Sequence, residues 1–275
     1  MTNSRRPFQN GFAAGFTRDS ANRFRRAFAA YFFLVISMTL AIPPLASAQE
    51  KELPVKVNPG QLKPAMIFWR VGINDPEGEL AMVETFYPST YNGKAVWRGI
   101  HRANDPTIKD FDLHMDDVDA TTLRPVRSVF RFDEGYVNRS YDGNKVKLES
   151  RSGEKTSSSE HTLSTGVMPA NGPASGLFLA ALPLRKGYSA TYHVLSHQKQ
   201  TADPMKLSVV GRETIRIAAG EYDTFVVVTS PAGGEPGEIT KHWVLASPPH
   251  YTIRTEWKPK PGEIKLSEVT RLLVG

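Results

Sequence analysis

The chain has 275 residues, of which 40% are hydrophobic and 23% charged, the composition of a folded protein with a hydrophobic core. Its formal net charge is +6, but residues 1–48 hold six arginines and one aspartate, which leaves 28 basic and 27 acidic residues beyond them. The excess charge belongs to this amino-terminal segment, which argues against a nucleic-acid-binding role. The absence of cysteine excludes disulfides, thiolate metal sites, a cysteine nucleophile and a lipid-modified cysteine.

Residues 1–48 have the parts of a secretory signal peptide. A basic stretch precedes an apolar run over 27–42, and the small residues Ala46-Ser47-Ala48 follow two prolines. We predict cleavage between Ala48 and Gln49, and a periplasmic or secreted mature protein without a membrane span. The apolar run is short for a span, so an uncleaved anchor is the less favoured alternative.

Two arginine pairs near the amino terminus resemble twin-arginine export signals. They occur in "SRRPF" at 4–8 and "RRAF" at 25–28. The first lies far from the apolar run and the second lacks the usual flanking residues. These features favour the general secretory route, and the continuous apolar block is not typical of a mitochondrial transit peptide.

From Met66 onward, apolar and polar residues alternate with a period of two, as expected of strands. Runs bounded by Gly, Pro, Asn or Asp predict strands at 66–71, 80–87, 94–101, 110–115, 125–132, 135–142, 145–150, 188–195, 206–218, 222–230, 238–246, 250–257 and 263–273. Asn92-Gly93 and Asp142-Gly143 predict tight hairpin turns, because these residues accept a positive φ at little cost. We therefore predict a mainly all-β protein with an antiparallel, strongly curved sheet or incomplete barrel.

The predicted domain covers residues 66–275 and follows a proline-containing lead-in at 49–65. Two of its segments do not read as strands. Residues 150–173 are polar and rich in Ser and Gly, which predicts a mobile loop. The apolar residues at 174–183 predict one short helix that ends at Pro183 and plugs an open sheet, although a buried strand is the alternative.

The stretch "GRETIRIAAGEYDTFVVVT" at 211–229 predicts a hairpin. Ile215 and Ile217 share one face, Gly220 supplies the turn, and Phe225 to Val228 form an apolar strand covered on both faces. The stretch resembles the signature of a periplasmic family known as domain of unknown function 3108. The segments "DDVDATTLRPVRSVFRFDEGYVNRSYD", "GLFLAALPLRKGYSATYHV" and "KHWVLASPPHYTIRTEW" extend the resemblance, which covers roughly residues 80–273.

The resemblance implies a secreted β-sheet protein of the cell envelope with no established chemistry. The curved sheet expected of the family also resembles lipoprotein-carrier folds, in which an incomplete barrel shelters acyl chains against short helices. This is an analogy of fold, and a fold does not determine function.

Metal and catalytic motifs are weak in this sequence. His193 and His197 lie four residues apart without a third ligand at fixed spacing. The segment "HMDDVD" at 114–119 lacks the glycine and final glutamate of a calcium loop, so we interpret it as a strand end that runs into a turn. No hydrolase motif is present, and Glu84, Glu213 and Glu256 are only isolated candidates for an acid–base pair. We predict no catalytic residue, metal or cofactor.

Aromatic residues within the predicted strands are the remaining candidates for a site. An ordinary core explains them, because aromatic strand residues usually pack. The alternative is a groove for an acyl chain or another apolar group. Its candidate ligand-binding residues are Trp97, Phe130, Leu177, Phe178, Tyr192, Phe225, Trp243 and Trp257.

Three functions follow from these predictions. The first is a non-enzymatic envelope protein that binds a lipid or other apolar ligand, and a continuous apolar cavity would favour it. The second is an envelope scaffold or assembly factor that binds a protein partner through exposed sheet edges. The third is a hydrolase of envelope glycans or lipids, favoured by convergent carboxylates with perturbed pKa values.

Overall fold

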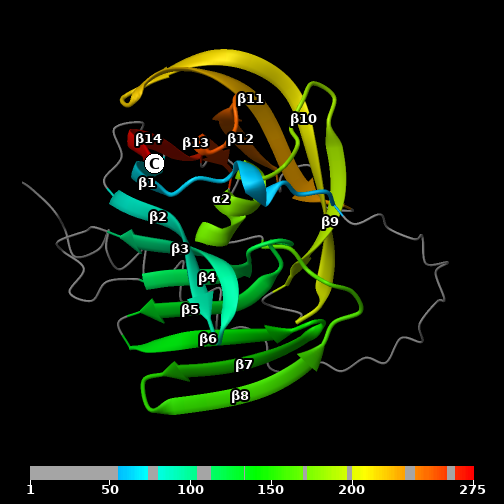
Figure 1. Cartoon of the computed structure of the whole chain (residues 1–275). Helices are drawn as coiled ribbons and strands as arrows, with labels where there is room; N and C mark the ends of the chain where they lie inside the picture. The colour runs from blue at the N-terminus through cyan, green and yellow to red at the C-terminus, as the bar shows by residue number, and fades with distance from the viewer. Residues whose placement is uncertain are drawn as a thin grey trace, which may run out of the picture. The chain divides into compact units, whose positions relative to one another are not determined.

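A computed structural model describes residues 55–73, 80–103, 113–132, 134–169, 172–196, 200–232, 239–258 and 264–275. In this part of the chain one antiparallel sheet has the strand order β8-β7-β6-β5-β4-β3-β2-β1-β14-β13-β12-β11-β10-β9 (Figure 1). The strands are β1 (Ala65–Ile73), β2 (Leu80–Tyr91), β3 (Lys94–Ala103), β4 (Leu113–Asp119), β5 (Pro125–Phe132), β6 (Gly135–Asp142), β7 (Lys145–Ser152), β8 (Lys155–Thr162), β9 (Ser189–Leu195), β10 (Ala202–Ile217), β11 (Gly220–Pro231), β12 (Thr240–Leu245), β13 (Thr252–Trp257) and β14 (Lys265–Val274). A short 3-10 turn, η1 (Pro59–Gln61), and the helix α2 (Pro173–Ala180) complete the fold.

The sheet curls around α2 and does not close into a barrel (Figure 1). Strands β8 and β9 end the strand order and are not paired with each other. Met168, in the connection from β8 to α2, instead forms an isolated parallel bridge with Val194 of β9. The prediction of a curved antiparallel sheet with one short helix is therefore confirmed.

The predicted hairpin turns are present at both positions. In the first turn Asn92 has a φ of 48° and Gly93 a φ of 76°. In the second, Asp142 ends β6 and pairs with Lys145, so the turn residues are Gly143, with a φ of 58°, and Asn144. These left-handed conformations are the reason that Asn and Gly occupy the turns. Of the predicted strand at 110–115, residues 110–112 lie outside the described residues, and β4 continues past Met115 to Asp119.

The prediction of a mobile loop over 150–173 is wrong for most of that segment. Residues 150–152 complete β7, and 155–162 form β8, which pairs with β7 over its whole length. Most side chains of β8 are exposed to solvent. An edge strand whose side chains face solvent is polar, and its composition therefore resembles that of a loop.

Helix α2 forms where the sequence predicted a short helix or a buried strand. Gly172 precedes it with a φ of 76°, and Pro173 occupies the first turn, where its missing N–H costs no helical hydrogen bond. Six of its eight residues are buried, and buried residues follow it at Ala181 and Leu182. A helix that is apolar on all sides requires burial, which the concave face of the sheet provides.

The hydrophobic core continues on both sides of α2. Leu177 packs in one cluster with Trp97 and Trp243, whereas Phe178 packs in a second cluster with Tyr192 and Phe225. A third, smaller cluster joins the opposite ends of the sheet, with Val146 of β7 and Leu195 of β9 in contact through the segment that follows β8. The helix and this segment therefore link strands that are distant in the strand order.

The β10–β11 hairpin is the long arch at the top of Figure 1. Phe225, Val226 and Val227 are all buried, which confirms that β11 is covered on both faces here. A β-bulge interrupts β10 next to Val209. Beyond the bulge, Glu213 accepts a hydrogen bond from the Trp243 indole. The hairpin thus closes over part of the core.

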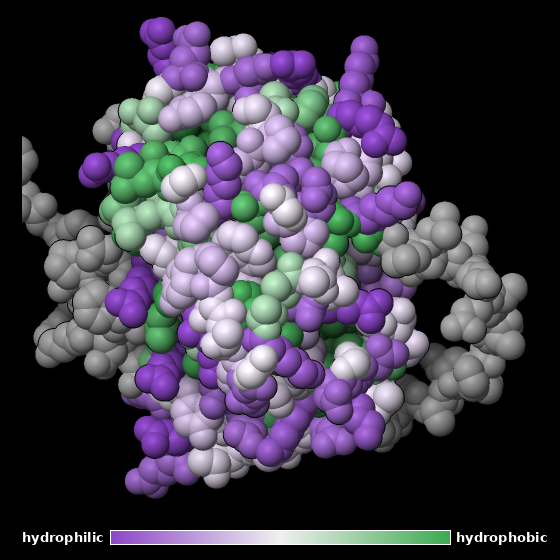
Figure 2. Space-filling view, in the orientation of Figure 1, coloured by the Kyte–Doolittle hydropathy of each residue, from purple (hydrophilic) through white to green (hydrophobic). Residues whose placement is uncertain are grey.

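Part of the surface is apolar. Figure 2 shows hydrophobic atoms at the upper left, where β14 and β1 lie in Figure 1. Met66, Leu273 and Val274 are between 38% and 42% exposed, and Met66 pairs with Leu273 across the two strands. The described residues contain no helix long and apolar enough to cross a membrane.

Candidate functional site

The concave face of the sheet holds polar groups in two neighbouring rows. Phe86 identifies this face, because its ring contacts Gly176 of α2 and stacks on Tyr251 at 5.6 Å. Side chains paired across strands share a face. One row therefore contains Phe86, Gly99, Asp116, Ser128 and Arg139, and the next contains Glu84, His101, His114, Phe130 and Val137.

Glu84 is the acid at one end of this arrangement. Its Oε2 accepts a hydrogen bond of 2.9 Å from the Trp69 indole, and its Oε1 lies 3.8 Å from Nδ1 of His101. Burial raises the pKa of Glu84 to about 7, against the lowering effect of the Trp69 hydrogen bond. Burial likewise lowers the pKa of His101 to about 4. Glu84 therefore titrates near neutral pH, whereas His101 is neutral at that pH.

His114 and Asp116 anchor the amino end of α2 on β4. His114 Nε2 lies 3.1 Å from Asp116 Oδ1 and 3.3 Å from Ser128 Oγ. The other oxygen of Asp116 accepts a 3.2 Å hydrogen bond from the backbone N–H of Ala174. A carboxylate at this position satisfies a helix N–H that has no partner within the helix.

The His114 ring fits between two neighbours. It meets the Phe130 ring edge-on with centroids 5.5 Å apart. A Cβ on Gly172 would lie 2.1 Å from its Cε1 atom. Glycine is required at this position both by its positive φ and by this close approach.

Arg139 is the buried cation of the site. It is 7% exposed, and its Nε atom is buried without a hydrogen-bond acceptor among the described residues. Burial lowers the pKa of Arg139, which the charge of Asp116 partly offsets. Tyr141, two residues further along β6, has its pKa raised to about 12 by burial and stays a neutral hydroxyl.

A small cavity of about 40 Å³ lies beside Arg139. Its lining combines the polar side chains of His114, Asp116, Asp117, Arg127, Ser128 and Tyr141 with apolar residues that include Met168, Leu195 and Ala174. The volume is sufficient for a water molecule or a small polar group. A buried cation, hydroxyl groups and an apolar wall therefore meet at the amino end of α2.

A wider hollow of about 330 Å³ lies at the far ends of β5, β6 and β7. It is lined by Arg131, Tyr136 and Arg151, among others. Arg131 and Arg151 are exposed, so their charges are solvated without a ligand. The hollow therefore makes a weaker case for a specific site than the buried cavity does.

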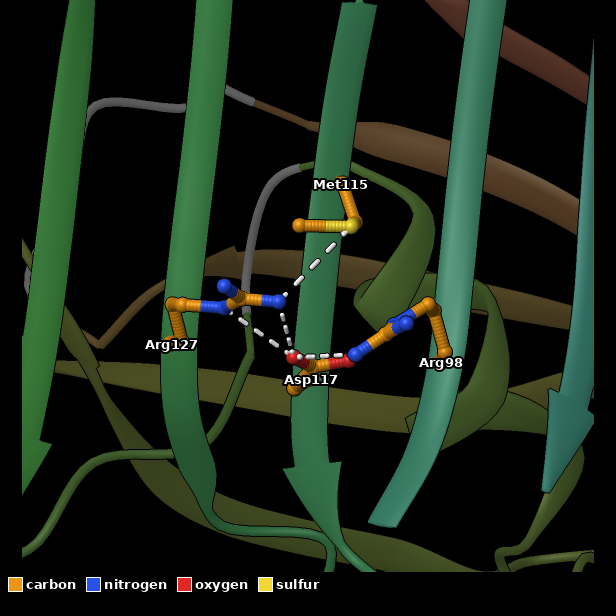
Figure 3. Close-up of polar contacts among 4 residues, drawn as sticks. All are labelled: Arg98, Met115, Asp117 and Arg127. Atoms are coloured by element: carbon orange, nitrogen blue, oxygen red, sulfur yellow. Dashed lines mark hydrogen bonds and ion pairs between the residues drawn. The ribbon is translucent and has the colours of Figure 1, made fainter. Parts of the chain in front are cut away.

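A second polar cluster lies on the opposite face of the same strands (Figure 3). Asp117 is completely buried between two arginines. Its carboxylate accepts hydrogen bonds of 2.6 and 3.0 Å from Arg98 and of 2.8 and 3.1 Å from Arg127. The Arg127 guanidinium also lies 4.2 Å from the centre of the Tyr91 ring. Asp117 therefore joins β3, β4 and β5, and Asp117 and Arg127 also belong to the lining of the small cavity beside Arg139.

The eight predicted ligand-binding residues do not line one surface. Trp97, Leu177 and Trp243 belong to one core cluster, and Phe178, Tyr192 and Phe225 to another. Phe130 packs on His114, and Trp257 is 38% exposed. The six residues in the core clusters therefore pack with α2 and do not line an open groove.

The other candidate groups are also separated. Glu84 bonds to Trp69, Glu213 to Trp243, and Glu256 lies 4.0 Å from Lys258. His197 lies outside the described residues, and within them no group of three or more His, Asp or Glu side chains is placed to hold a metal ion. The three glutamates therefore do not form one acid–base site.

In the "HMDDVD" segment, consecutive aspartates face opposite sides of β4. Asp116 lies on the concave face and Asp117 on the other. Asp119 instead accepts hydrogen bonds from the backbone and side chains of Thr121 and Thr122. The interpretation as a strand end that runs into a turn is correct for Asp119, whereas Asp116 and Asp117 lie inside the strand.

Sequence reasoning missed Arg139, Tyr141 and the role of His114. A signal was present in "GYVNRSYD", where Arg139 and Tyr141 alternate in phase with the apolar Val137. A charged residue in the phase of a buried strand face indicates a buried charge.

Comparison with known families establishes the relationship of the chain. The model of a family described as "Protein of unknown function (DUF3108)" matches residues 66–267, which is most of the chain. The chain belongs to the DUF3108 family. The match covers β1 to the first part of β14 and confirms the resemblance noted in the sequence.

Solved structures similar to this DUF3108 protein come from three bacteria. A candidate lipoprotein of Parabacteroides distasonis is 10% identical, with a TM-score of 0.31 over 78% of this chain and 96% of that chain. A candidate exported protein of Bacteroides fragilis, described as having a YmcC-like fold, is 9% identical, with a TM-score of 0.34 over 81% and 98%. The hypothetical lipoprotein YmcC of Escherichia coli is 13% identical, with a TM-score of 0.32 over 82% and 90%. A comparison with curated proteins found no match.

Proposed function

We propose that this DUF3108 protein is an exported, non-enzymatic protein of the cell envelope that binds a lipid on the concave face of its sheet. One observation carries the proposal. An apolar helix, α2, occupies the concave face of a sheet whose end strands are not paired with each other. Export is supported by the signal-like segment at residues 1–48.

In this proposal α2 is a plug that a ligand replaces. Leu177 and Phe178 pack into the two main core clusters. The chain segments directly before and after α2 are not strands of the sheet. Moving α2 away would expose the apolar side chains that it covers, among them Phe86 and Trp97. An acyl chain would restore the lost apolar contacts and keep water from this surface.

Native mass spectrometry of the protein purified from a bacterial periplasm without detergent tests the proposal. We expect a bound mass that organic extraction removes and that is identified as a lipid. A protein that carries no lipid, and that takes up none from added envelope lipids, would refute the proposal.

Two variants test the plug. Replacing the buried Leu177 by alanine weakens the docking of α2, since such a substitution costs about 2–5 kcal/mol. Because the plug competes with the ligand, L177A should bind a fluorescent fatty acid at least about tenfold more tightly. Trp97→Ala, which removes part of the binding surface, should bind it more weakly. Equal affinities in folded variants would contradict the plug.

A second candidate function is the binding of a protein partner, favoured by β8. This strand ends the described sheet, its outer edge is unpaired, and most of its side chains are exposed. An extended peptide could add to such an edge through main-chain hydrogen bonds. If the protein proves free of lipid, crosslinking from β8 in intact cells is the next experiment, with a defined crosslinked protein as the expected result.

A further inference from the structure

The cavity beside Arg139 is built around a cation that the protein does not satisfy. Arg139 is more than nine-tenths buried, and its Nε–H has no acceptor among the described residues. A buried guanidinium loses its hydration, and this loss must be offset by hydrogen bonds or by an opposite charge. The pairing of Arg139 is thus incomplete in the protein alone.

Asp116 does not supply the missing acceptor, although it lies on the neighbouring part of the same face. One of its oxygens contacts His114 Nε2, and the other accepts the Ala174 N–H. It thus contributes an electrostatic interaction with Arg139, and its hydrogen-bonding oxygens are directed to α2 and to His114. The Nε–H of Arg139 therefore still lacks an acceptor among the described residues.

The lining of the cavity contains both polar and apolar groups. Arg139 and Arg127 are its cations, and the hydroxyls of Tyr141 and Ser128 can donate hydrogen bonds. The carboxylates of Asp116 and Asp117 also belong to the lining, but they are held by Ala174 and His114 and by Arg98 and Arg127. The apolar residues are Met168, Leu195 and Ala174, in β9, α2 and the segment before α2. A ligand that ends in an anion and continues as an apolar chain matches this mixed lining.

We propose that the cavity binds the carboxylate of an acyl chain, with Arg139 as the anion-binding residue. The planar guanidinium has donors in a fork that suits the two oxygens of a carboxylate. A carboxylate also suits a cavity of only about 40 Å³. This inference rests on the proposed lipid-binding function and specifies its ligand, a fatty acid whose chain lies where α2 packs.

The test compares two ligands of equal chain length, hexadecanoate and hexadecanol, on the purified protein. We expect hexadecanoate to bind at least about tenfold more tightly than hexadecanol. The Arg139→Gln variant should lose that preference and keep its affinity for the alcohol. Arg151→Gln, which removes an exposed arginine of β7, is the matched control and should behave like the native protein.

Arg139→Lys is a second variant, used in case Arg139→Gln does not fold. It keeps the charge but lacks the guanidinium fork, so it should bind hexadecanoate with intermediate affinity. If acid and alcohol bind the native protein equally, the carboxylate inference is wrong and the lipid-binding function stands. An unchanged preference in folded R139Q or R139K leads to the same conclusion.

An experiment without lipid separates anion binding at Arg139 from lipid binding on the concave face. Acetate is titrated into the isotope-labelled protein, and the Arg139 Nε–H resonance is followed by NMR. A saturable shift of the Arg139 resonance supports the anion site even if no long-chain ligand binds. The Arg151 Nε–H resonance is the reference and should not shift. The absence of a shift, together with no uptake of hexadecanoate, means that the cavity holds only water and overturns the inference.

Discussion

Asp116 and Asp117 show how one residue position changes the role of a carboxylate. The two are consecutive in β4 and both are buried, but they lie on opposite faces. Asp116 serves the helix and the candidate cavity, whereas Asp117 joins three strands through Arg98 and Arg127. Buried carboxylates are retained only where such partners exist.

Asp117→Asn tests the structural role of the second cluster. The amide cannot neutralise the two arginines and cannot accept all of their hydrogen bonds. We expect the free energy of unfolding to fall by about 3–5 kcal/mol, the cost of removing one partner of a buried ion pair. Urea denaturation measures the change.

The control for this variant is Asp223→Asn. Asp223 also binds an arginine, Arg212, through several hydrogen bonds, but both side chains are exposed. Solvent screens such a pair, so D223N should have nearly native stability. A similar loss in the two variants would contradict the importance of burial.

Glu84 should make stability depend on pH. Its pKa is about 7 in the folded protein and 4.5 in the unfolded chain. Between these values the folded state holds a proton that the unfolded state has released, so its contribution to stability is lost as the pH rises. The loss amounts to about 3 kcal/mol.

Glu84→Gln removes this titration. From pH 4.5 to about 7, the stability of E84Q relative to the native protein should therefore increase by about 3 kcal/mol. His101 and His242, whose pKa values burial lowers to about 4, act with the opposite sign, but they are present in both proteins. Urea titrations at several pH values measure the difference, and a constant difference would show that Glu84 does not titrate in this range.

At the scale of elements, α2 depends on a single glycine for its position. Gly172 combines a φ of 76° with contact to the His114 ring, and the N–H of Ala174, in the first turn of the helix, donates a hydrogen bond to Asp116. A side chain at this position would push the helix away from β4. The position of the helix, and with it the shape of the cavity, is therefore set at its amino end.

Gly172→Ala tests this dependence against Gly93→Ala. Both glycines have a φ of 76°, so both variants should lose about 1–2 kcal/mol from the left-handed conformation. A Cβ on Gly93 meets nothing within 4 Å, whereas one on Gly172 would meet His114. We expect a larger loss in the free energy of unfolding for G172A than for G93A, measured by urea denaturation. Equal losses would show that the His114 ring moves aside at little cost.

At the scale of the whole molecule, the two halves of the sheet meet around α2 and the segment that follows β8. Val146 of β7 and Leu195 of β9 belong to one small cluster, although their strands lie near opposite ends of the strand order. In the described residues, side-chain packing and the isolated bridge between Met168 and Val194 thus link the two ends of the sheet, although β8 and β9 do not pair. Such a closure can open locally without breaking the sheet ladder.

The predicted signal peptide is tested on the intact protein. When the full chain is expressed in a bacterium, we expect the exported form to begin at Gln49. Intact mass measurement of the periplasmic fraction checks this expectation. A product that retains residues 1–48 and fractionates with membranes would show an uncleaved anchor instead.

The sequence by itself indicated most of the strands and their turns and favoured a short helix over a buried strand at 174–183, because these depend on local patterns. Alternation identifies a strand with one buried face, Asn-Gly and Asp-Gly accept left-handed turns, and an apolar run next to proline indicates a short buried helix. The family resemblance also came from local segments. Strand β8 escaped this reasoning because exposed edge strands and loops share a polar composition.

Only the tertiary structure decided which side chains meet. Glu84, His101, His114 and Arg139 come from four strands, and strand register alone places them in neighbouring rows. Turn geometry and the hydrophobic pattern set the register of each hairpin. Only the assembled sheet shows that successive pairings bring these four side chains together. Of the aromatic residues singled out in the sequence, Trp97, Phe178, Tyr192, Phe225 and Trp243 pack in the core, whereas Trp257 is exposed. The buried cation and its cavity arise from the packing of distant segments.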